Sequence, residues 1–154
     1  MGLIDFIRNA GEKIFGSSAD AATPTTDEAV LSKRATALEG HVRALGLAVD
    51  DLKIKVADEI AHVKGKVATQ EIREKVVLAI GNVEGVAKVD DRLEVTTPQP
   101  AARYYTVAKG DTLSKIAKQH YGDANKYPQI FEANKPMLKH PDKIYPGQVL
   151  RIPV

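Results

Sequence analysis

Apolar residues recur at spacings of three and four along residues 27–46, which is the pattern of a helix with one buried face. The recurring positions are Val30, Leu31, Ala35, Leu38, Val42 and Leu45. In the next two apolar stretches lysine stands between the apolar residues, at Leu52-Lys53-Ile54-Lys55-Val56 and at Val63-Lys64-Gly65-Lys66-Val67. Because side chains alternate between the two faces of a strand, these stretches predict a hairpin that buries one face.

A second helix and a third strand complete this first predicted domain. Residues 70–80 predict the helix, because their apolar positions recur at helical spacing. The inward positions are Ile72, Val76, Val77 and Ile80. Residues 87–95 predict the strand, and residues 97–103 predict a stiff, polar linker because they contain two prolines. The order α-β-β-α-β is therefore expected over residues 27–96.

The remaining residues, 104–153, predict a smaller domain of order β-α-α-β with its two strands paired. Asp111 or Thr112 is placed to cap the first helix of this domain. Pro128 suits the start of the second helix, where its missing N–H costs nothing. A Pro-Gly turn precedes a closing strand over residues 149–152. The whole chain is thus expected to be an α+β protein.

The N-terminal residues 1–16 predict a short amphipathic helix. Its apolar stripe is Leu3, Phe6, Ile7, Ala10 and Ile14. The opposite side mixes acidic and basic residues, so we expect this helix to dock on the first domain rather than to lie on a membrane surface. Residues 17–26 are rich in Ser, Ala, Thr and Pro and predict a linker between this helix and the first domain.

Composition narrows the classes of function. The chain has 154 residues and a net charge of +2, and its basic residues are spread among acidic ones, which excludes a basic nucleic-acid footprint. No secretory signal pattern begins the chain, and Phe6 stands where a myristoylation motif needs Ser or Thr. No apolar run approaches the roughly 20 residues of a membrane span, and the absence of cysteine suits a reducing compartment. We expect a cytoplasmic monomer without a nucleic-acid partner.

No arrangement of residues indicates catalysis or a transition-metal site. The histidines are scattered, without cysteine or a paired histidine, and no serine lies in an elbow motif. They are His41, His62, His120 and His140. Asp90 and Asp91 are adjacent but have no third carboxylate at ligand spacing, so they indicate a solvated strand edge rather than a divalent-cation site. The chain is not expected to be an enzyme.

The order of residues in the second domain resembles a LysM domain. The resemblance rests on residues 105–120, 130–134 and 144–153. LysM domains typically bind glycans that contain N-acetylglucosamine. The resemblance implies a glycan groove at Gly110, Asp111, Thr112, Leu113, Asn134, Ile144 and Tyr145. Because a cytoplasmic protein rarely meets peptidoglycan, we interpret this domain mainly as a stabilising partner of the first domain.

The first domain resembles a BON domain over residues 27–95. The resemblance rests on residues 63–67 and on residues 81–93, in which a glycine follows a helix, a second glycine stands four residues later and a strand begins. Glu59 departs from the pattern, because a glycine is expected in that hairpin. We interpret this departure as one that concerns the turn rather than the function.

A BON domain followed by a LysM domain, behind the leader Met-Gly-Leu-Ile-Asp-Phe, resembles the Kbp family of bacterial cytoplasmic potassium-binding proteins. Residues 131–139 also resemble this family. The resemblance implies a K⁺ ion held by main-chain carbonyl groups of the leader and of the helix-to-strand loop. In this sequence the matching residues are Ile7, Arg8, Ala10, Gly81, Val83 and Val86.

Such a site makes chemical sense for this sequence. Selective K⁺ sites replace the water around the ion with several neutral carbonyl oxygens. Free carbonyl groups occur at helix C-termini and in glycine turns, here at Gly81 and Gly85. One ion that bridges the leader and the BON domain would compact the protein, so we expect a potassium sensor. The alternative is a peptidoglycan-binding cell-wall module that is exported without a visible signal.

Overall fold

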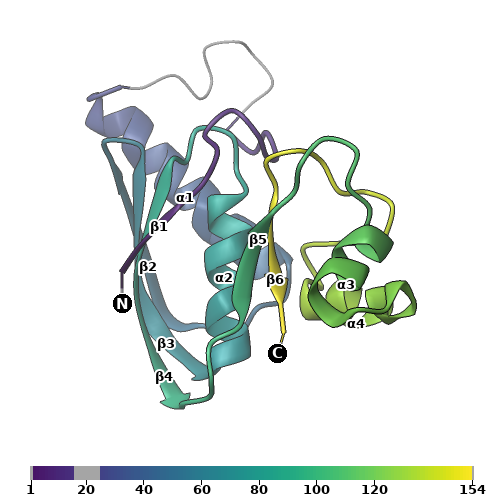
Figure 1. Ribbon diagram of the computed structural model, residues 1–154. Helices are drawn as coiled ribbons and strands as arrows, with labels where there is room; N and C mark the ends of the chain where they lie inside the picture. The colour runs from purple at the N-terminus through teal and green to yellow at the C-terminus, as the bar shows by residue number, and fades with distance from the viewer. Residues whose placement is uncertain (1, 16–24, 154) are drawn as a thin grey trace.

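The computed structural model describes residues 2–15 and 25–153, which form two packed domains (Figure 1). The elements of the larger domain are β1 (Gly2–Asp5), α1 (Glu28–Ala44), β2 (Asp50–Ala57), β3 (Ile60–Thr69), α2 (Gln70–Gly81) and β4 (Lys88–Thr97). Those of the smaller domain are β5 (Arg103–Thr106), α3 (Leu113–Tyr121), the 3-10 helix η1 (Ala124–Lys126), α4 (Tyr127–Ala133) and β6 (Val149–Ile152). The α+β class is confirmed, as are the element orders α-β-β-α-β and β-α-α-β. Among the described residues, no helix is long and apolar enough to cross a membrane.

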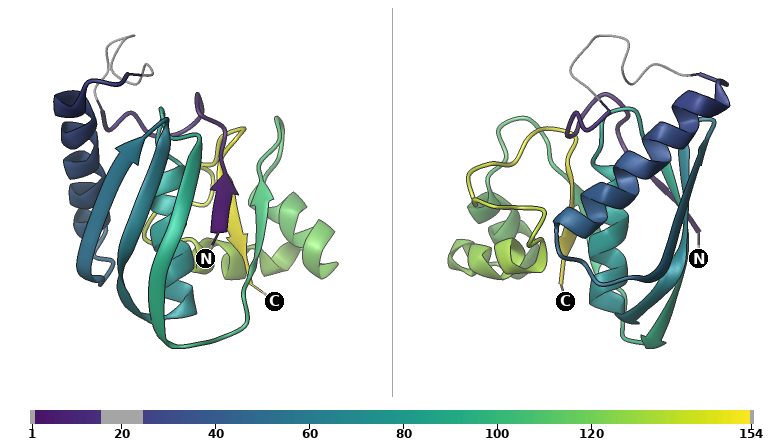
Figure 2. Two further views of the ribbon diagram at one scale, coloured as in Figure 1. Left: turned by 90° about the vertical axis from the view of Figure 1, so that its left-hand side faces the viewer. Right: turned by 180° about the vertical axis from the view of Figure 1, so that it is seen from behind.

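The strands of the larger domain form one sheet in the order β1-β4-β3-β2. β2 and β3 are the predicted hairpin, and the apolar positions of β2 are buried while its lysines are exposed. β4 runs parallel to β3, because α2 crosses over between them. α1 and α2 pack on the same face of the sheet, and no described helix covers the opposite face (Figure 2).

The predicted N-terminal helix is wrong. Residues Gly2–Asp5 form the strand β1, which pairs antiparallel with β4. Residues 6–15 continue as turns and contain no helix. The apolar stripe is divided accordingly, because Phe6 is buried whereas Leu3 and Ile7 are 57% and 50% exposed.

Two physical reasons favour the strand. The open edge of β4 offers backbone hydrogen bonds along the whole of β1, whereas a helix of this length is marginal in water by itself. Gly11 has a φ of 124°, which no helical residue adopts. The predicted linker at residues 17–26 lies almost entirely outside the described residues.

Short polar side chains start three of the helices. Asp27, Thr69 and Thr112 each accept a hydrogen bond from a backbone N–H in the first turn of α1, α2 and α3 respectively. Of the two predicted caps for α3, Thr112 therefore takes the role. Asp111 instead accepts a hydrogen bond of 2.5 Å from the hydroxyl of Tyr105, and this bond lowers the pKa of the carboxyl group.

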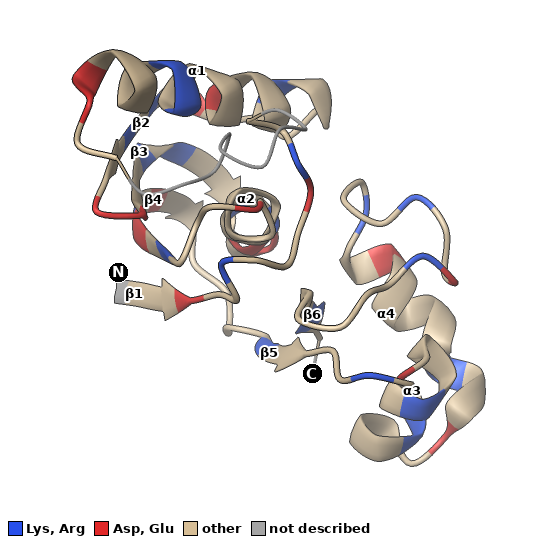
Figure 3. Cartoon of the chain, turned by 90° about the horizontal axis from the view of Figure 1, so that it is seen from above, with Lys and Arg blue, Asp and Glu red and all other residues tan. Residues whose placement is uncertain are grey.

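α2 lies between the sheet and the smaller domain (Figure 3). Its residues 76–80 are all apolar, and each is at most 1% exposed. A surface helix buries one stripe only, so burial on all sides requires two packing partners. α2 packs on β3, β4 and α1 of the larger domain and on β6 of the smaller domain. The sequence-based prediction accounted only for the side that faces the sheet.

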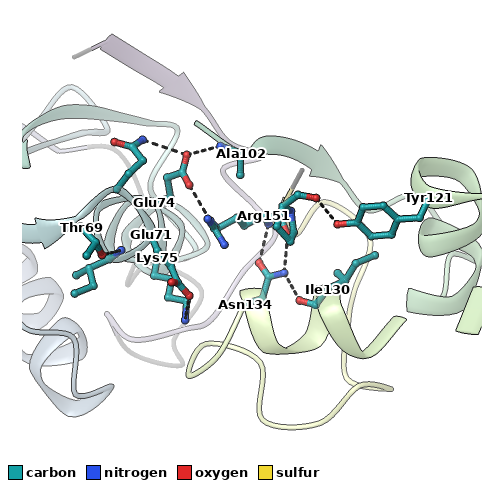
Figure 4. Close-up of polar contacts among 12 residues, drawn as sticks. Thr69, Glu71, Glu74, Lys75, Ala102, Tyr121, Ile130, Asn134 and Arg151 are labelled. Atoms are coloured by element: carbon teal, nitrogen blue, oxygen red, sulfur yellow. Dashed lines mark hydrogen bonds and ion pairs between the residues drawn. The ribbon is translucent and has the colours of Figure 1, made fainter. Parts of the chain in front are cut away.

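A buried ion pair joins the two domains at the middle of α2 (Figure 4). Glu74 is 2% exposed, and its carboxylate accepts a hydrogen bond of 2.8 Å from Nε of Arg151 in β6. The other carboxylate oxygen accepts from the N–H of Ala102 at 2.9 Å and from the amide of Gln70 at 3.2 Å. The buried charge is therefore both paired and hydrogen-bonded, which is the condition under which a protein interior tolerates it.

Asn82 joins the two domains at the end of α2. Its Oδ1 accepts from the N–H of Val149 at 2.8 Å, and its Nδ2 donates to the carbonyl oxygen of Val149 at 2.8 Å. The amide side chain thus pairs with the first residue of β6 as a neighbouring strand would. Asn82 is only 5% exposed, so water cannot replace these bonds without opening the interface.

We expect Asn82→Ala to lower the free energy of unfolding by about 2–4 kcal/mol, because it leaves a buried N–H and a buried carbonyl group without partners. Urea unfolding followed by circular dichroism measures this change. Asn125→Ala is the matched control, since Asn125 is exposed, and its effect should stay within about 0.5 kcal/mol. Equal midpoints for the two variants would contradict the role assigned to Asn82.

Candidate functional site

The N-terminal segment (residues 6–15) lies along the helix-to-strand loop (residues 82–87) that joins α2 to β4 (Figure 1). The N–H of Phe6 donates to the carbonyl oxygen of Ala87 at 2.9 Å, and the N–H of Gly85 donates to that of Arg8 at 2.8 Å. Further along, Glu12 forms an isolated parallel bridge with Val83. Backbone groups therefore join two segments that are far apart in the sequence.

The six residues implied for an ion site lie in these two segments and at the end of α2. The carbonyl groups of Ile7, Arg8 and Val83 each accept one backbone hydrogen bond, at 3.1, 2.8 and 3.1 Å. The carbonyl groups of Ala10, Gly81 and Val86 accept no backbone hydrogen bond from the described residues, apart from any within regular helices and strands. A carbonyl oxygen has two lone pairs, so the first three also retain acceptor capacity. The two segments can therefore offer neutral oxygens to a cation.

The end of α2 also contributes electrostatically. α2 ends at Gly81, and the last carbonyl groups of a helix have no partner further along it. These groups carry partial negative charge, which stabilises a nearby cation by roughly 0.3–1 kcal/mol at an exposed helix end. The helix-to-strand loop begins at this end, so a cation held by the loop lies in a favourable field.

Gly81 and Gly85 fit this region for different reasons. Gly85 has a φ of 102°, a conformation that residues with a Cβ rarely adopt. Gly81 is helical, but a Cβ at this position would overlap the ring of Phe6. The absence of a side chain at Gly81 thus lets Phe6 lie against the end of α2. This contact fixes where the N-terminal segment crosses the loop.

The turn before β6 contacts the same segment from the smaller domain. A Cβ on Gly147 would come within 2.7 Å of the Cβ of Ala10, so the two backbones lie very close. The hydroxyl group of Tyr145 is buried, and burial raises the pKa of this phenol, with a further contribution from Glu12. The N-terminal segment therefore packs against both domains.

Sequence reasoning missed the roles of Phe6, Glu59 and Asn82 in this region. Glu59 forms an ion pair with Arg8, and its carbonyl oxygen accepts from the N–H of Ala87 at 2.9 Å. Its φ of 62° explains why a glycine is expected there. The side chain at this position contacts the N-terminal segment through Arg8. The interpretation of Glu59 as a matter of the turn alone is therefore incomplete.

Several residues implied for a glycan groove have structural roles in the smaller domain. Asn134 is 1% exposed and exchanges hydrogen bonds of 2.7 and 2.9 Å with the backbone of Arg151, which ties the end of α4 to β6 (Figure 4). Leu113 is buried in the core of the domain, and Thr112 caps α3. Gly110, Asp111, Ile144 and Tyr145 lie in the two loops beside these residues.

Asp90 and Asp91 have separate partners on opposite faces of β4. Asp90 pairs with His62 at 2.8 Å, and this hydrogen bond lowers the pKa of the Asp90 carboxyl group. Asp91 is 5% exposed and pairs with Arg73 at 2.8 Å, so its interpretation as a solvated residue is wrong. Nowhere in residues 2–15 and 25–153 do three His, Cys, Asp or Glu side chains gather as a metal-ligand group.

Comparison with known proteins shows that two domain families match this chain, one after the other. Residues 31–97 match the BON domain, and residues 105–153 match the LysM domain. The chain is 49% identical over 154 residues to the potassium binding protein Kbp of Escherichia coli O6:H1 (strain CFT073), and the match covers 99% of both chains.

Two further relatives match only a part of the chain. An uncharacterised protein of Deinococcus radiodurans is 53% identical over 49 residues, which are 32% of this chain and 19% of that protein. The uncharacterised protein YqbP of Bacillus subtilis is 42% identical over 62 residues, which are 34% of this chain and 28% of that protein. Full-length similarity is therefore found with the E. coli protein, and the other two share a segment.

We expect Gly81→Ala to destabilise the protein by about 1–3 kcal/mol, because the added methyl group overlaps the ring of Phe6. Gly40→Ala is a matched control in α1, where no atom lies within 4 Å of the new methyl group. That control should stabilise the protein by about 0.5–1 kcal/mol, because alanine favours a helix. Urea unfolding of both variants measures the difference, and equal changes would show that Phe6 does not pack on Gly81.

Proposed function

Because the chain belongs to the Kbp family, we propose that it binds K⁺ through backbone carbonyl groups of the N-terminal segment and the helix-to-strand loop. Its E. coli relative is named a potassium binding protein. The proposed ligands are the carbonyl oxygens of Ile7, Arg8, Ala10, Gly81, Val83 and Val86. The observation that carries this proposal is the direct pairing of the two segments, in which Gly85 donates to the Arg8 carbonyl at 2.8 Å.

The chain is composed of two binding modules and is not an enzyme. K⁺ is accordingly the bound signal in this proposal and takes no part in a reaction. Neutral carbonyl oxygens suit a monovalent cation, because they replace its hydration shell. Several carboxylates would instead leave a negative charge in the site that one K⁺ cannot neutralise. Hydrogen bonds between backbone groups hold both segments, so their carbonyl groups depend little on the identity of the side chains.

Ion binding is proposed to compact the protein, and this change is the basis of its role as a sensor. An ion shared by the two segments would add to the hydrogen bonds that already join them. The N-terminal segment also contacts Gly147, and the loop contacts Val149 through Asn82, so the smaller domain is held by the same region. Binding energy at the two segments would therefore stabilise the packing of both domains.

The smaller domain supports the larger one in this proposal. Its strand β6 covers α2 and satisfies the buried carboxylate of Glu74. The LysM match at residues 105–153 supports a second candidate function, the binding of glycans with N-acetylglucosamine. Sedimentation with purified peptidoglycan distinguishes the two functions, because a K⁺ sensor need not sediment with it. The proposed location is the cytoplasm, which the absence of cysteine fits and cell fractionation tests.

We expect isothermal titration calorimetry to give a saturable binding heat with KCl and a much smaller heat with NaCl at equal ionic strength. The physical reason is that carbonyl groups held at a fixed spacing match one ion size better than another. At a K⁺ concentration of roughly 100 times the dissociation constant, the free energy of unfolding should rise by about 2.7 kcal/mol. Small-angle scattering of the same samples should show a smaller radius of gyration in KCl.

Choline chloride at the same ionic strength is the control for general salt effects in these titrations. Equal and negligible heats in KCl and NaCl would overturn the proposed K⁺ binding. A saturable K⁺ heat without any change in the radius of gyration would leave binding in place and overturn the proposed compaction.

We expect Gly85→Val to weaken K⁺ affinity by about tenfold or more, because a β-branched residue at a φ of 102° displaces the neighbouring carbonyl groups. Val83→Ala should have a smaller effect on affinity, since it keeps the carbonyl group and removes only apolar packing. Calorimetry of the two variants gives the ranking, and circular dichroism verifies that both are folded. A larger loss of affinity in Val83→Ala would show that main-chain groups are not the ligands.

A further inference from the structure

The outer face of the sheet, defined here by the exposed residues of β2, β3 and β4, is basic at its centre. Lys53 lies opposite Lys64 in the antiparallel pair, and Lys64 lies beside Arg92 in the parallel pair. Three cations therefore form a row across three neighbouring strands, which are roughly 4.8 Å apart in any sheet. Lys55, an exposed residue of β2, extends this basic area along that strand.

Acidic residues of the described chain leave much of this charge unbalanced. Lys53, Lys55, Lys64 and Lys66 are exposed, and none of them forms an ion pair with a described residue. Asp90 on the same face is already paired, with His62 at 2.8 Å and with Arg92 at 2.9 Å.

Lys66 lies between two carboxylates in the register of the strands, Asp50 of β2 and Glu94 of β4, so the row of three cations is the part of this face without acidic neighbours across the strands. Like charges directly opposite each other destabilise a pair of strands. The pair Lys53 and Lys64 therefore costs stability, and a partner of opposite charge would relieve that cost.

The basic face is also hollowed. Two neighbouring depressions of about 420 and 520 Å³ lie on it. Lys53, Lys64 and Arg92 line both of them, and the larger one is also lined by Asp51 and Glu94. Depressions of this size accommodate the side chains of a partner molecule.

The residue composition of the outer face limits the class of partner that it can bind. β2, β3 and β4 contain no Phe, Tyr or Trp, so these strands lack the large aromatic side chains on which nucleic-acid bases usually stack. The exposed large hydrophobic residues of the described chain are Leu3, Ile7 and Tyr127, and none of them belongs to these three strands. Recognition on this face therefore depends on charge and on hydrogen bonds from lysine. Carboxylate side chains on an extended backbone meet these requirements, because they reach into the depressions and accept from the lysines.

We propose that the outer face of the sheet binds an acidic, extended segment of a partner protein. The site is separate from the N-terminal segment and the helix-to-strand loop, so this binding does not depend on the proposed K⁺ site. Association through exposed charges is steered by long-range attraction and weakens as salt is added.

Fluorescence anisotropy with a labelled deca-glutamate peptide tests this proposal on the full chain. We expect saturable binding at low ionic strength, and at least about tenfold weaker binding to Lys53→Glu/Lys64→Glu. Lys118→Glu/Lys126→Glu is the matched control, because it makes the same change in net charge at exposed positions in the smaller domain. That control should change the affinity less than about twofold.

The single variant Lys53→Glu separates binding from folding. It replaces a pair of like charges with a pair of opposite charges, so it should melt at the same temperature as the wild type or higher while binding the peptide more weakly. Three results would overturn the proposal: no peptide binding at low salt, equal losses in the two double variants, or binding of inorganic polyphosphate or phosphatidylglycerol vesicles in place of the peptide.

Discussion

The structure depends on the burial of the C-terminal half of α2 on all of its sides. The sheet and α1 of the BON domain cover this helix, and β6 of the LysM domain covers it as well. Five consecutive apolar residues, Val76 to Ile80, are removed from water as a result, and no single-sided packing could achieve this. The helix also carries Glu74, whose buried carboxylate requires the cation supplied by Arg151. Without the LysM domain, the BON domain would therefore expose the apolar residues of this helix and leave the carboxylate of Glu74 without its cation.

This constraint determines where the candidate ion site lies. α2 ends at Gly81, and the helix-to-strand loop begins there beside the N-terminal segment. Asn82 in this loop pairs with Val149 of the LysM domain, while Phe6 packs against Gly81. The end of one helix thus organises contacts with both other parts of the protein. If the N-terminal segment becomes more or less ordered, the interface between the domains should change as well, because the segment and the interface involve the same few residues.

The N-terminal segment shows how tertiary contacts override a local pattern. Its apolar residues recur at spacings that suit a helix, and the sequence alone does not reveal the open edge of β4. In the structure that edge is paired by Gly2–Asp5, and the backbone hydrogen bonds outweigh the weak helical tendency of so short a segment. Phe6 then occupies the space above Gly81 that only a glycine can leave open. The conclusion that this segment docks through apolar residues did not require the correct secondary structure.

Apart from β1 and η1, the sequence by itself determined the elements of both domains, because periodic burial and short polar caps such as Thr69 and Thr112 are local properties. It also indicated the glycines of the loop, since a strained φ such as that of Gly85 restricts the residue type directly. Only the tertiary structure decided the strand at the N-terminus, the pairing of Glu74 with Arg151 and the bridge from Asn82 to Val149. These depend on which surfaces meet, and residues far apart in the sequence leave no periodic trace of their contact. The same reason applies to carbonyl ligands, because every residue has a carbonyl group and its orientation is set by the fold.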